Sequence, residues 1–103
     1  MNTIEINISR DYSITPGASL RRYGDFSGEE FRERFLEPHF KNHIDNYKLR
    51  IILDGTYGYS ASFLEEAFGG LSRKYDSERV LNRLEFVSEE ELLLVKEILE
   101  YIN

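Results

Sequence analysis

The chain has 103 residues, of which 41% are hydrophobic and 31% are charged, so it can form one globular domain but not two. It contains no cysteine, which excludes disulfides, thiolate metal sites and a cysteine nucleophile. A net charge of −6 opposes binding to nucleic acids and anionic lipids. The apolar runs are far shorter than the ~20 residues of a membrane span, and the first residues lack the pattern of a secretory signal. We therefore expect a cytoplasmic protein with no nucleic-acid or membrane partner.

Three segments have the pattern of β-strands. Residues 4–8 alternate isoleucine with polar residues, which predicts a strand with one buried face. Residues 49–55 form a short, nearly continuous apolar run, typical of a strand covered on both faces. Residues 80–86 alternate again, with Val80, Leu84 and Phe86 against Arg83 and Glu85, and predict a third strand.

Three other segments have the pattern of helices. Each opens with a serine followed three residues later by a glutamate, namely Ser27/Glu30, Ser62/Glu65 and Ser88/Glu91. In such a capping box both side chains bond to backbone N–H groups of the first helical turn, which stabilises the helix by ~1 kcal/mol. Apolar residues at helical spacing follow each box, and Pro38 should end or kink the first helix near Glu37. In the third helix the expected principal apolar stripe is Leu92, Val95, Leu99 and Ile102, widened by Leu94 and Ile98.

The order of these elements is strand, helix, strand, helix, strand, helix. Strands that alternate with helices of this length are joined by right-handed crossovers into a largely parallel sheet. We therefore predict one small α/β domain over residues 1–103, with a mostly parallel sheet of four or a similar number of strands and three main helices.

Two stretches carry a resemblance to a known family. Residues 49–71, LRIILDGTYGYSASFLEEAFGGL, resemble the STAS domain (sulfate transporter and anti-sigma factor antagonist), and more closely the bacterial STAS-like family of unknown function. Residues 16–38, PGASLRRYGDFSGEEFRERFLEP, are similar to the first loop and first helix of that family. The resemblance covers roughly residues 4–100.

The resemblance implies a regulatory signalling module that binds another protein, in the classical branch an ATP-dependent serine kinase. Classical members are switched by phosphorylation of a serine in an Asp-Ser-Ser-Gly turn before a helix. In this chain Ser60 stands at the acidic position, Ala61 at the phosphorylated serine and Ser62 at the next serine, so the usual acceptor is missing.

The predicted partner-binding surface is the loop and helix start that follow the second strand. Exposed tyrosines are favoured anchors in protein interfaces, and a helix N-terminus stabilises an added phosphate. The alternative is that the serines only cap the helix and that Asp54 only accepts backbone N–H groups in a turn. The residues assigned to partner binding or to a phospho-switch are Thr56, Tyr57, Tyr59, Ser60, Ser62, Glu65 and Glu66.

A second hypothesis, of a different class, is a sensor of an anionic small molecule or nucleotide. Arg21 and Arg22 precede the helix start at Ser27, so two guanidinium groups and free N–H donors could converge on a phosphate. The alternative is that the arginines pair with Asp25, Glu29 or Glu30.

We expect no enzymatic activity, cofactor or metal. The chain has neither a P-loop nor a dinucleotide-binding motif, and its paired glutamates lie in first helical turns, where the helix dipole explains them. His39 and His43 have the spacing of a metal pair, but Pro38 interrupts the helix that would align them. A third hypothesis is a homo-oligomeric structural subunit that uses Gly69, Gly70 and the last helix as its interface.

Overall fold

The computed structural model describes residues 2–103, which form a parallel sheet of three strands. These strands are β1 (Asn2–Asn7), β2 (Tyr47–Ile52) and β3 (Leu84–Val87), arranged in the order β1-β2-β3. Ile6 lies opposite Ile51 on the central strand, and Ile51 lies opposite Phe86. The predicted parallel α/β arrangement is confirmed, whereas the prediction of four strands is wrong for the described residues.

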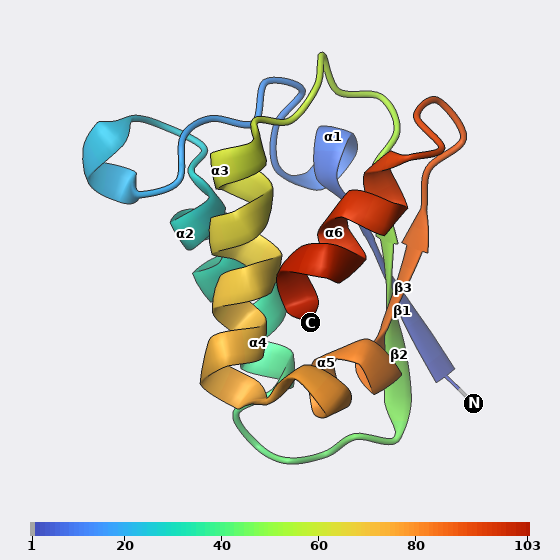
Figure 1. The fold of residues 1–103 in the computed structure, drawn as a ribbon. Coiled ribbons are helices and arrows are strands. Elements are labelled where there is room, and N and C mark those ends of the chain that lie inside the picture. The colour runs from blue at the N-terminus through green and yellow to red at the C-terminus, as the bar shows by residue number, and fades with distance from the viewer. Residues whose placement is uncertain (1) are drawn as a thin grey trace.

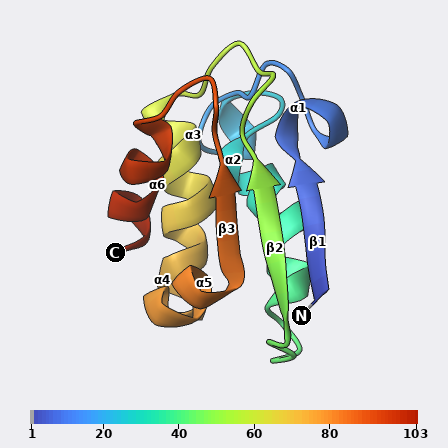
Figure 2. The same ribbon diagram turned by 90° about the vertical axis from the view of Figure 1, so that its right-hand side faces the viewer.

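The helices lie on one face of this sheet, so the domain has two layers (Figure 2). Consecutive helical segments form two long rods, the first rod over residues 28–39 and the second rod over residues 61–75, and each contains a π-helical segment. The two rods run side by side behind the sheet (Figures 1 and 2). The helical segments are α1 (Ile8–Asp11), η1 (Arg21–Tyr23), α2 (Gly28–Phe31), η2 (Arg32–Leu36), η3 (Glu37–His39), α3 (Ala61–Leu64), η4 (Glu65–Gly69), α4 (Gly70–Tyr75), α5 (Ser77–Arg83) and α6 (Leu94–Ile102). The structure thus divides the helical residues into more segments than the three main helices that were predicted.

The second face of the sheet is open, which corrects the expectation that β2 is covered on both faces. Leu49 and Ile51 are completely buried under the helices, but Arg50 between them is exposed. Arg50 pairs with Glu85 across the open face at 3.4 Å, and Glu5 stands in register on its other side. The charged row Glu5, Arg50 and Glu85 therefore marks the face that no part of the described chain covers.

The segment that leads into β3 is a helix rather than the start of a strand. Asp76 caps α5 by accepting a hydrogen bond from the N–H of Arg79, and Val80 is buried within this helix. The strand begins only at Leu84, so the predicted strand over residues 80–86 is wrong in its first half. The sequence pattern did not distinguish a strand from a helix here, because Val80 and Leu84 are also one helical turn apart.

The three predicted helix starts have different outcomes. Ser27 is the N-cap of α2, as predicted, and its Oγ accepts a hydrogen bond from the N–H of Glu30 at 3.0 Å. Ser88 caps no helix: α6 begins six residues later at Leu94, and the Ser88 hydroxyl donates to the carbonyl of Glu91. Consequently Leu92 lies outside the helix and is exposed, and the stripe that α6 buries is Leu94, Ile98 and Ile102.

The two long rods approach closely because α2 begins with a glycine. A Cβ added to Gly28 would lie 2.5 Å from the backbone oxygen of Phe63 on α3. Phe31 and Phe63 are fully buried at this crossing, and their ring centroids are 6.0 Å apart. The two rods are therefore so close at this point that any residue other than glycine at position 28 would force the backbone to shift.

A buried carboxylate fastens the same two rods further along. Glu37 is 2% exposed and accepts hydrogen bonds from Arg32 at 2.9 Å, Lys74 at 2.8 Å and Tyr75 at 3.2 Å. Burial by itself would raise the pKa of Glu37, but the hydrogen bonds from Lys74 and Arg32 hold that pKa below its ordinary value. We call Arg32, Glu37, Glu66, Lys74 and Tyr75 the inter-rod network.

Gly69 and Gly70 lie inside the second rod rather than at its end. A Cβ at Gly70 would meet the Arg32 guanidinium at 2.5 Å, so this glycine leaves room for the inter-rod network. Gly69 is buried beneath the side chains of Glu65 and Arg73.

Within residues 2–103, no helix combines the length and the apolar character that a bilayer crossing requires.

Candidate functional site

The loops after β2 and β3 lie side by side at the carboxyl end of the sheet, next to the start of α3 (Figure 1). Asp54 accepts backbone hydrogen bonds from Glu89 and Glu90, at 2.9 Å each to its nearer oxygen. Glu90 in turn accepts one from the N–H of Gly55 at 2.8 Å. Asp54 accepts backbone N–H groups as interpreted, but its donors lie in the loop after β3 rather than in its own turn, and the two loops form one cross-linked surface.

Tyr57 stands on the loop after β2 with 85% of its surface exposed. Its own N–H donates to the carbonyl of Ile14 at 2.8 Å, which fixes the backbone beneath the ring. Gly55 and Gly58 flank this turn with φ values of +94° and +130°, a region that side chains disfavour. The backbone at Tyr57 is therefore held in place while its ring projects into solvent, as the sequence predicted.

Tyr59 differs from Tyr57 and is not the exposed anchor that was expected. Its hydroxyl donates to the carbonyl of Leu53 at 2.8 Å, and its ring lies 5.8 Å from that of Phe63. Burial raises the pKa of Tyr59 to about 12. Thr56 also supports the loop, because its Oγ1 accepts a hydrogen bond from the N–H of Gly58 at 3.2 Å. Both side chains hold the loop in shape.

The N-cap of the second rod is Ser60 rather than the predicted Ser62. The Ser60 hydroxyl accepts a hydrogen bond from the N–H of Phe63 at 3.1 Å, and it lies 3.2 Å from the Ser62 hydroxyl. Ser62 is exposed in the first helical turn. The helix starts two residues earlier than the capping pattern indicated, because Ser60 has the extended backbone that an N-cap requires.

Glu65 and Glu66 are half-buried and engaged in ion pairs, whereas both were expected to be exposed contact residues. Glu65 pairs with Arg73 on the next turns of the rod at 2.6 Å. Glu66 pairs with Arg32 of the neighbouring rod at 2.5 Å, and Arg32 also donates to the Glu66 carbonyl. Glu66 therefore belongs to the inter-rod network, and its charge is directed inward.

The three residues considered for anion binding do not converge on one point. Arg21 pairs with Glu33 at 2.8 Å and with Glu30 at 3.9 Å, so of the acids named as alternatives only Glu30 forms an ion pair with it. The guanidinium of Arg22 lies over the ring of Tyr23, 5.2 Å from its centroid. Ser27 is fully buried and its hydroxyl is used as a helix cap. Beside the two arginines is a cavity of about 330 Å³ that Leu20 and Glu29 also line.

Two exposed leucines lie on the loop after β3, between Glu91 and Leu94, which line the same cavity as Tyr57, and sequence reasoning did not single them out as contact residues. Leu92 is 80% exposed and Leu93 is 78% exposed, both on the loop after β3. A shallow cavity of about 140 Å³ lies between the loops and has Tyr57 and Glu91 among its lining residues. We call Tyr57, Leu92 and Leu93 the carboxyl-edge rim. In the sequence, the Ser88/Glu91 pattern placed Leu92 in a helix stripe and so concealed this exposure.

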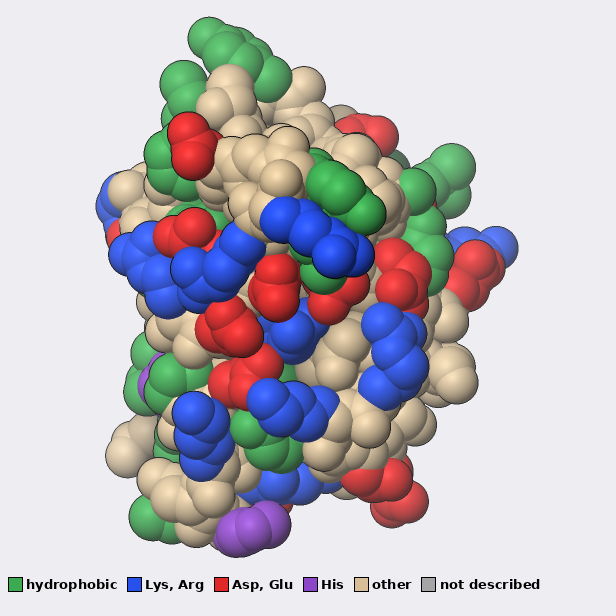
Figure 3. Space-filling view, turned by 90° about the vertical axis from the view of Figure 1, so that its left-hand side faces the viewer, with side chains coloured by type: hydrophobic (Ala, Val, Ile, Leu, Met, Phe, Trp, Pro, Cys, Tyr) green, Lys and Arg blue, Asp and Glu red, His purple; other side chains and the backbone are tan. Residues whose placement is uncertain are grey.

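The face that carries both rods presents a different surface. In Figure 3 basic and acidic side chains interleave over the middle of this face, and hydrophobic side chains gather at its upper end. That upper end is the end where the loops after β2 and β3 lie (Figures 1 and 3). Part of the exposed apolar surface therefore lies at the carboxyl edge of the sheet, and Ile4 and Ile44 are exposed elsewhere.

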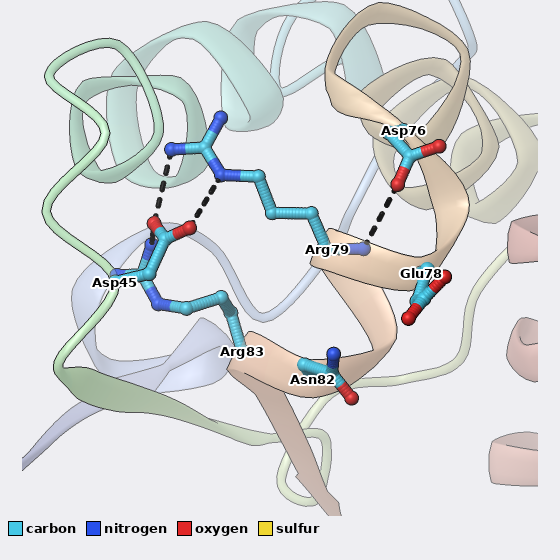
Figure 4. A pocket seen from close by; sticks show the side chains of 6 residues that line it. All are labelled: Asp45, Asp76, Glu78, Arg79, Asn82 and Arg83. Atoms are coloured by element: carbon cyan, nitrogen blue, oxygen red, sulfur yellow. Dashed lines mark hydrogen bonds and ion pairs between the residues drawn. The ribbon is translucent and has the colours of Figure 1, made fainter.

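A further cavity, of about 400 Å³, lies beside α5 and is bordered by ion pairs (Figure 4). Asp45 accepts from Arg79 at 2.8 Å and from Arg83 at 2.6 Å, and the hydrogen bonds from Arg79 lower the pKa of Asp45. The Arg83 guanidinium is buried 4.5 Å above the ring of Tyr47. This cluster anchors α5 to the segment before β2, and no sequence pattern indicated it.

His39 belongs to the same region and has a structural partner. Its Nδ1 lies 2.8 Å from the hydroxyl of Tyr47, and burial together with the charge of Arg83 lowers the pKa of His39. His43 lies on the following loop with a positive φ of 59°. Residues 2–103 contain no group of three or more His, Cys, Asp or Glu side chains placed to hold a metal ion.

Fold and site together define a two-layer α/β domain with a three-stranded parallel sheet and a cross-linked pair of loops at its carboxyl edge. A family model described as a STAS-like domain of unknown function (DUF4325) matches residues 27–92, which is more than half of the chain. The chain therefore belongs to this STAS-like family, and the resemblance found in the sequence is confirmed. No curated protein and no solved structure matches the chain significantly.

Proposed function

We propose that this STAS-like domain is a non-enzymatic regulatory module that binds a protein partner at the carboxyl-edge rim. The observation that carries the proposal is the 85% exposure of Tyr57 on a loop that glycines, Tyr59 and Asp54 hold in one conformation. A fixed aromatic side chain loses little conformational entropy on binding, so tyrosine at such a position is a strong anchor.

Two neighbouring features support a protein as the ligand. Leu92 and Leu93 present apolar surface on the neighbouring loop after β3, and most of their surface is exposed to water. The cavity between the loops is only about 140 Å³, smaller than the ~300 Å³ at which pockets for drug-sized molecules begin. Exposed apolar side chains around a small cavity suit the surface of another protein better than they suit an enclosed small molecule.

The proposed partner is an ATPase or histidine-kinase-like regulator, and this part of the proposal rests on the family resemblance. Ser60 and Ser62 lie beside the rim at the start of α3, so a phosphate on either one would alter the charge next to a bound partner. Because Ser60 rather than Ser62 is the N-cap, phosphorylation of the two serines should have different effects on the helix. Phosphate on Ser60 would remove the N-cap, whereas phosphate on Ser62 would leave the cap in place.

The test is capture of the partner by the tagged full chain from its own cells, followed by binding measurements with the purified partner. Tyr57→Ala should reduce affinity at least tenfold. Tyr23→Ala is the matched control, because Tyr23 is 63% exposed but lies on η1, in a different loop. The proposal fails if both variants bind as the wild type does, if both lose binding equally, or if the protein bound through Tyr57 is neither an ATPase nor kinase-like.

A further inference from the structure

The free edge of β1 is the longest unpaired strand edge in residues 2–103. β1 pairs with β2 over six residues and has no strand on its other side, whereas the opposite edge strand, β3, has only four residues. Figure 2 shows β1 at the margin of the sheet, with only α1 beside its carboxyl end. Such an edge presents a row of unpaired backbone N–H and C=O groups.

The core beneath this edge is incompletely covered. Ile4, Leu49 and Leu84 form one row in register on the helix side of the sheet. Leu49 is 0% exposed and Leu84 is 6% exposed, but Ile4 is 42% exposed. The helices therefore cover this row over β2 and β3 and leave its β1 end open.

The edge carries few of the features by which proteins prevent strand pairing. Natural edges are protected by charged side chains, above all lysine, by proline, by a bulge, by a very short strand or by a covering helix. β1 has the sequence Asn-Thr-Ile-Glu-Ile-Asn, with no lysine or proline, and its six-residue register with β2 is unbroken. Its one charge, Glu5, is on the open face of the sheet beside Arg10, at 4.0 Å.

We propose that β1 pairs with β1 of a second copy of this chain, antiparallel and about a twofold axis at Ile4. The pairing joins two three-stranded sheets into one of six strands with both helix layers on the same face. Each Ile4 then packs against Ile4 of the partner subunit, which covers the open end of the core row.

Charge disfavours the adjacent register that also keeps both helix layers on one face. With the axis at Ile4, Thr3 lies opposite Glu5 of the partner subunit. With the axis at Glu5, two carboxylates would face each other, which destabilises a strand pair. The pairing at Ile4 uses positions 2–6 of each strand, and α1 begins only at Ile8, so that helix does not obstruct it.

The interface is small and each chain carries a charge of −6, so the dimer should be weak and should strengthen when salt screens this repulsion. We expect sedimentation of the full chain to show a mass that rises with protein concentration from 12.1 kDa toward twice that value. The rise should begin at lower protein concentration in 0.5 M than in 0.05 M salt.

The decisive variant is Ile4→Lys, which places a charge in the centre of the proposed pair. It should weaken dimerisation at least tenfold. Ile44→Lys is the matched control, because Ile44 is 51% exposed and lies in the loop before β2. Circular dichroism and unfolding curves of both variants establish that a loss of dimer is not a loss of fold.

Hydrogen exchange provides a second measurement that does not depend on a substitution. The amides of residues 2–6 should become more protected as the protein concentration rises, and those of β3 should not. A wild-type chain that stays monomeric at both salt concentrations overturns the proposal. So does a dimer that Ile4→Lys leaves intact, which would place the interface elsewhere, for example at α6. Tyr57→Ala should leave the dimer unchanged, so this test and that of the carboxyl-edge rim are independent.

Discussion

The inter-rod network and the carboxyl-edge rim lie in different parts of the domain and place their side chains in opposite ways. At the network, charged side chains turn inward: Glu37 is 2% exposed, and Glu66 pairs with Arg32 across the rods. At the rim, apolar side chains turn outward, with Tyr57 85% exposed. In these two regions residue type is therefore a poor guide to exposure, because charged side chains with internal partners stabilise the fold and exposed apolar ones remain available for binding.

The largest effect is expected from removing the carboxylate at the centre of the inter-rod network. Glu37→Ala should lower the free energy of unfolding by about 3 kcal/mol, because it leaves the guanidinium of Arg32 largely buried without one of its two carboxylate partners. Chemical denaturation measures this loss. Glu33→Ala is the matched control, since Glu33 is exposed on the same rod and pairs only with the exposed Arg21.

Acid titration tests the contribution of Glu37 without removing its side chain, so no cavity is created. The folded chain holds the pKa of Glu37 below its ordinary value, so the unfolded chain binds a proton first as the pH falls. Stability from this group is therefore present at neutral pH and is lost progressively on acidification below the ordinary pKa of a glutamate. Glu37→Gln should flatten that decline in a series of unfolding curves, and an unchanged slope would contradict the assignment.

A second effect concerns the distance between the rods. Gly28→Ala should destabilise the fold by about 1–3 kcal/mol, because the new Cβ meets a backbone oxygen that cannot move alone. Gly69→Ala is the comparison, since its Cβ meets only the flexible ends of Glu65 and Arg73, and alanine favours a helix. Equal destabilisation by the two substitutions, measured by thermal unfolding, would show that the crossing at Gly28 is not tight.

A smaller change in the free energy of unfolding should distinguish the two serines at the start of the second rod. Ser60→Ala should cost about 1 kcal/mol because it removes the N-cap, whereas Ser62→Ala should change stability by less than half of that. Ser62→Asp should be slightly stabilising, since it adds a negative charge in the first helical turn. The opposite ranking of the two alanine variants would restore Ser62 as the cap.

The smallest effect on stability is expected at the rim itself. Tyr57→Ala should change the free energy of unfolding by less than about 0.5 kcal/mol, because the exposed ring has little to lose on truncation. Tyr59→Ala should cost considerably more, since its ring packs against the core and its hydroxyl bonds to Leu53. Similar unfolding curves for these two variants would contradict the assignment of Tyr57 to partner binding and of Tyr59 to holding the loop in shape.

The sequence by itself determined the local features of this protein. Period-two alternation identified the strand and its buried Ile6, although Ile4 is 42% exposed and Ile8, predicted in the same strand, begins α1. The cap at Ser27 and the exposure of Tyr57 also followed from patterns of a few residues. These features depend on neighbours within one strand or one helical turn. The family resemblance depended likewise on short runs of residues, and the match over residues 27–92 confirms it.

Tertiary structure decided the remainder, through contacts between residues far apart in the chain. Asp54 binds the N–H groups of Glu89 and Glu90, so no helix starts at Ser88 and the two leucines stay exposed. An ion pair with Arg32 of the first rod holds the Glu66 side chain between the two rods. The open β1 edge likewise follows only from the strand order. Local patterns contain no information on such pairings, because each one depends on how separate elements are placed against one another.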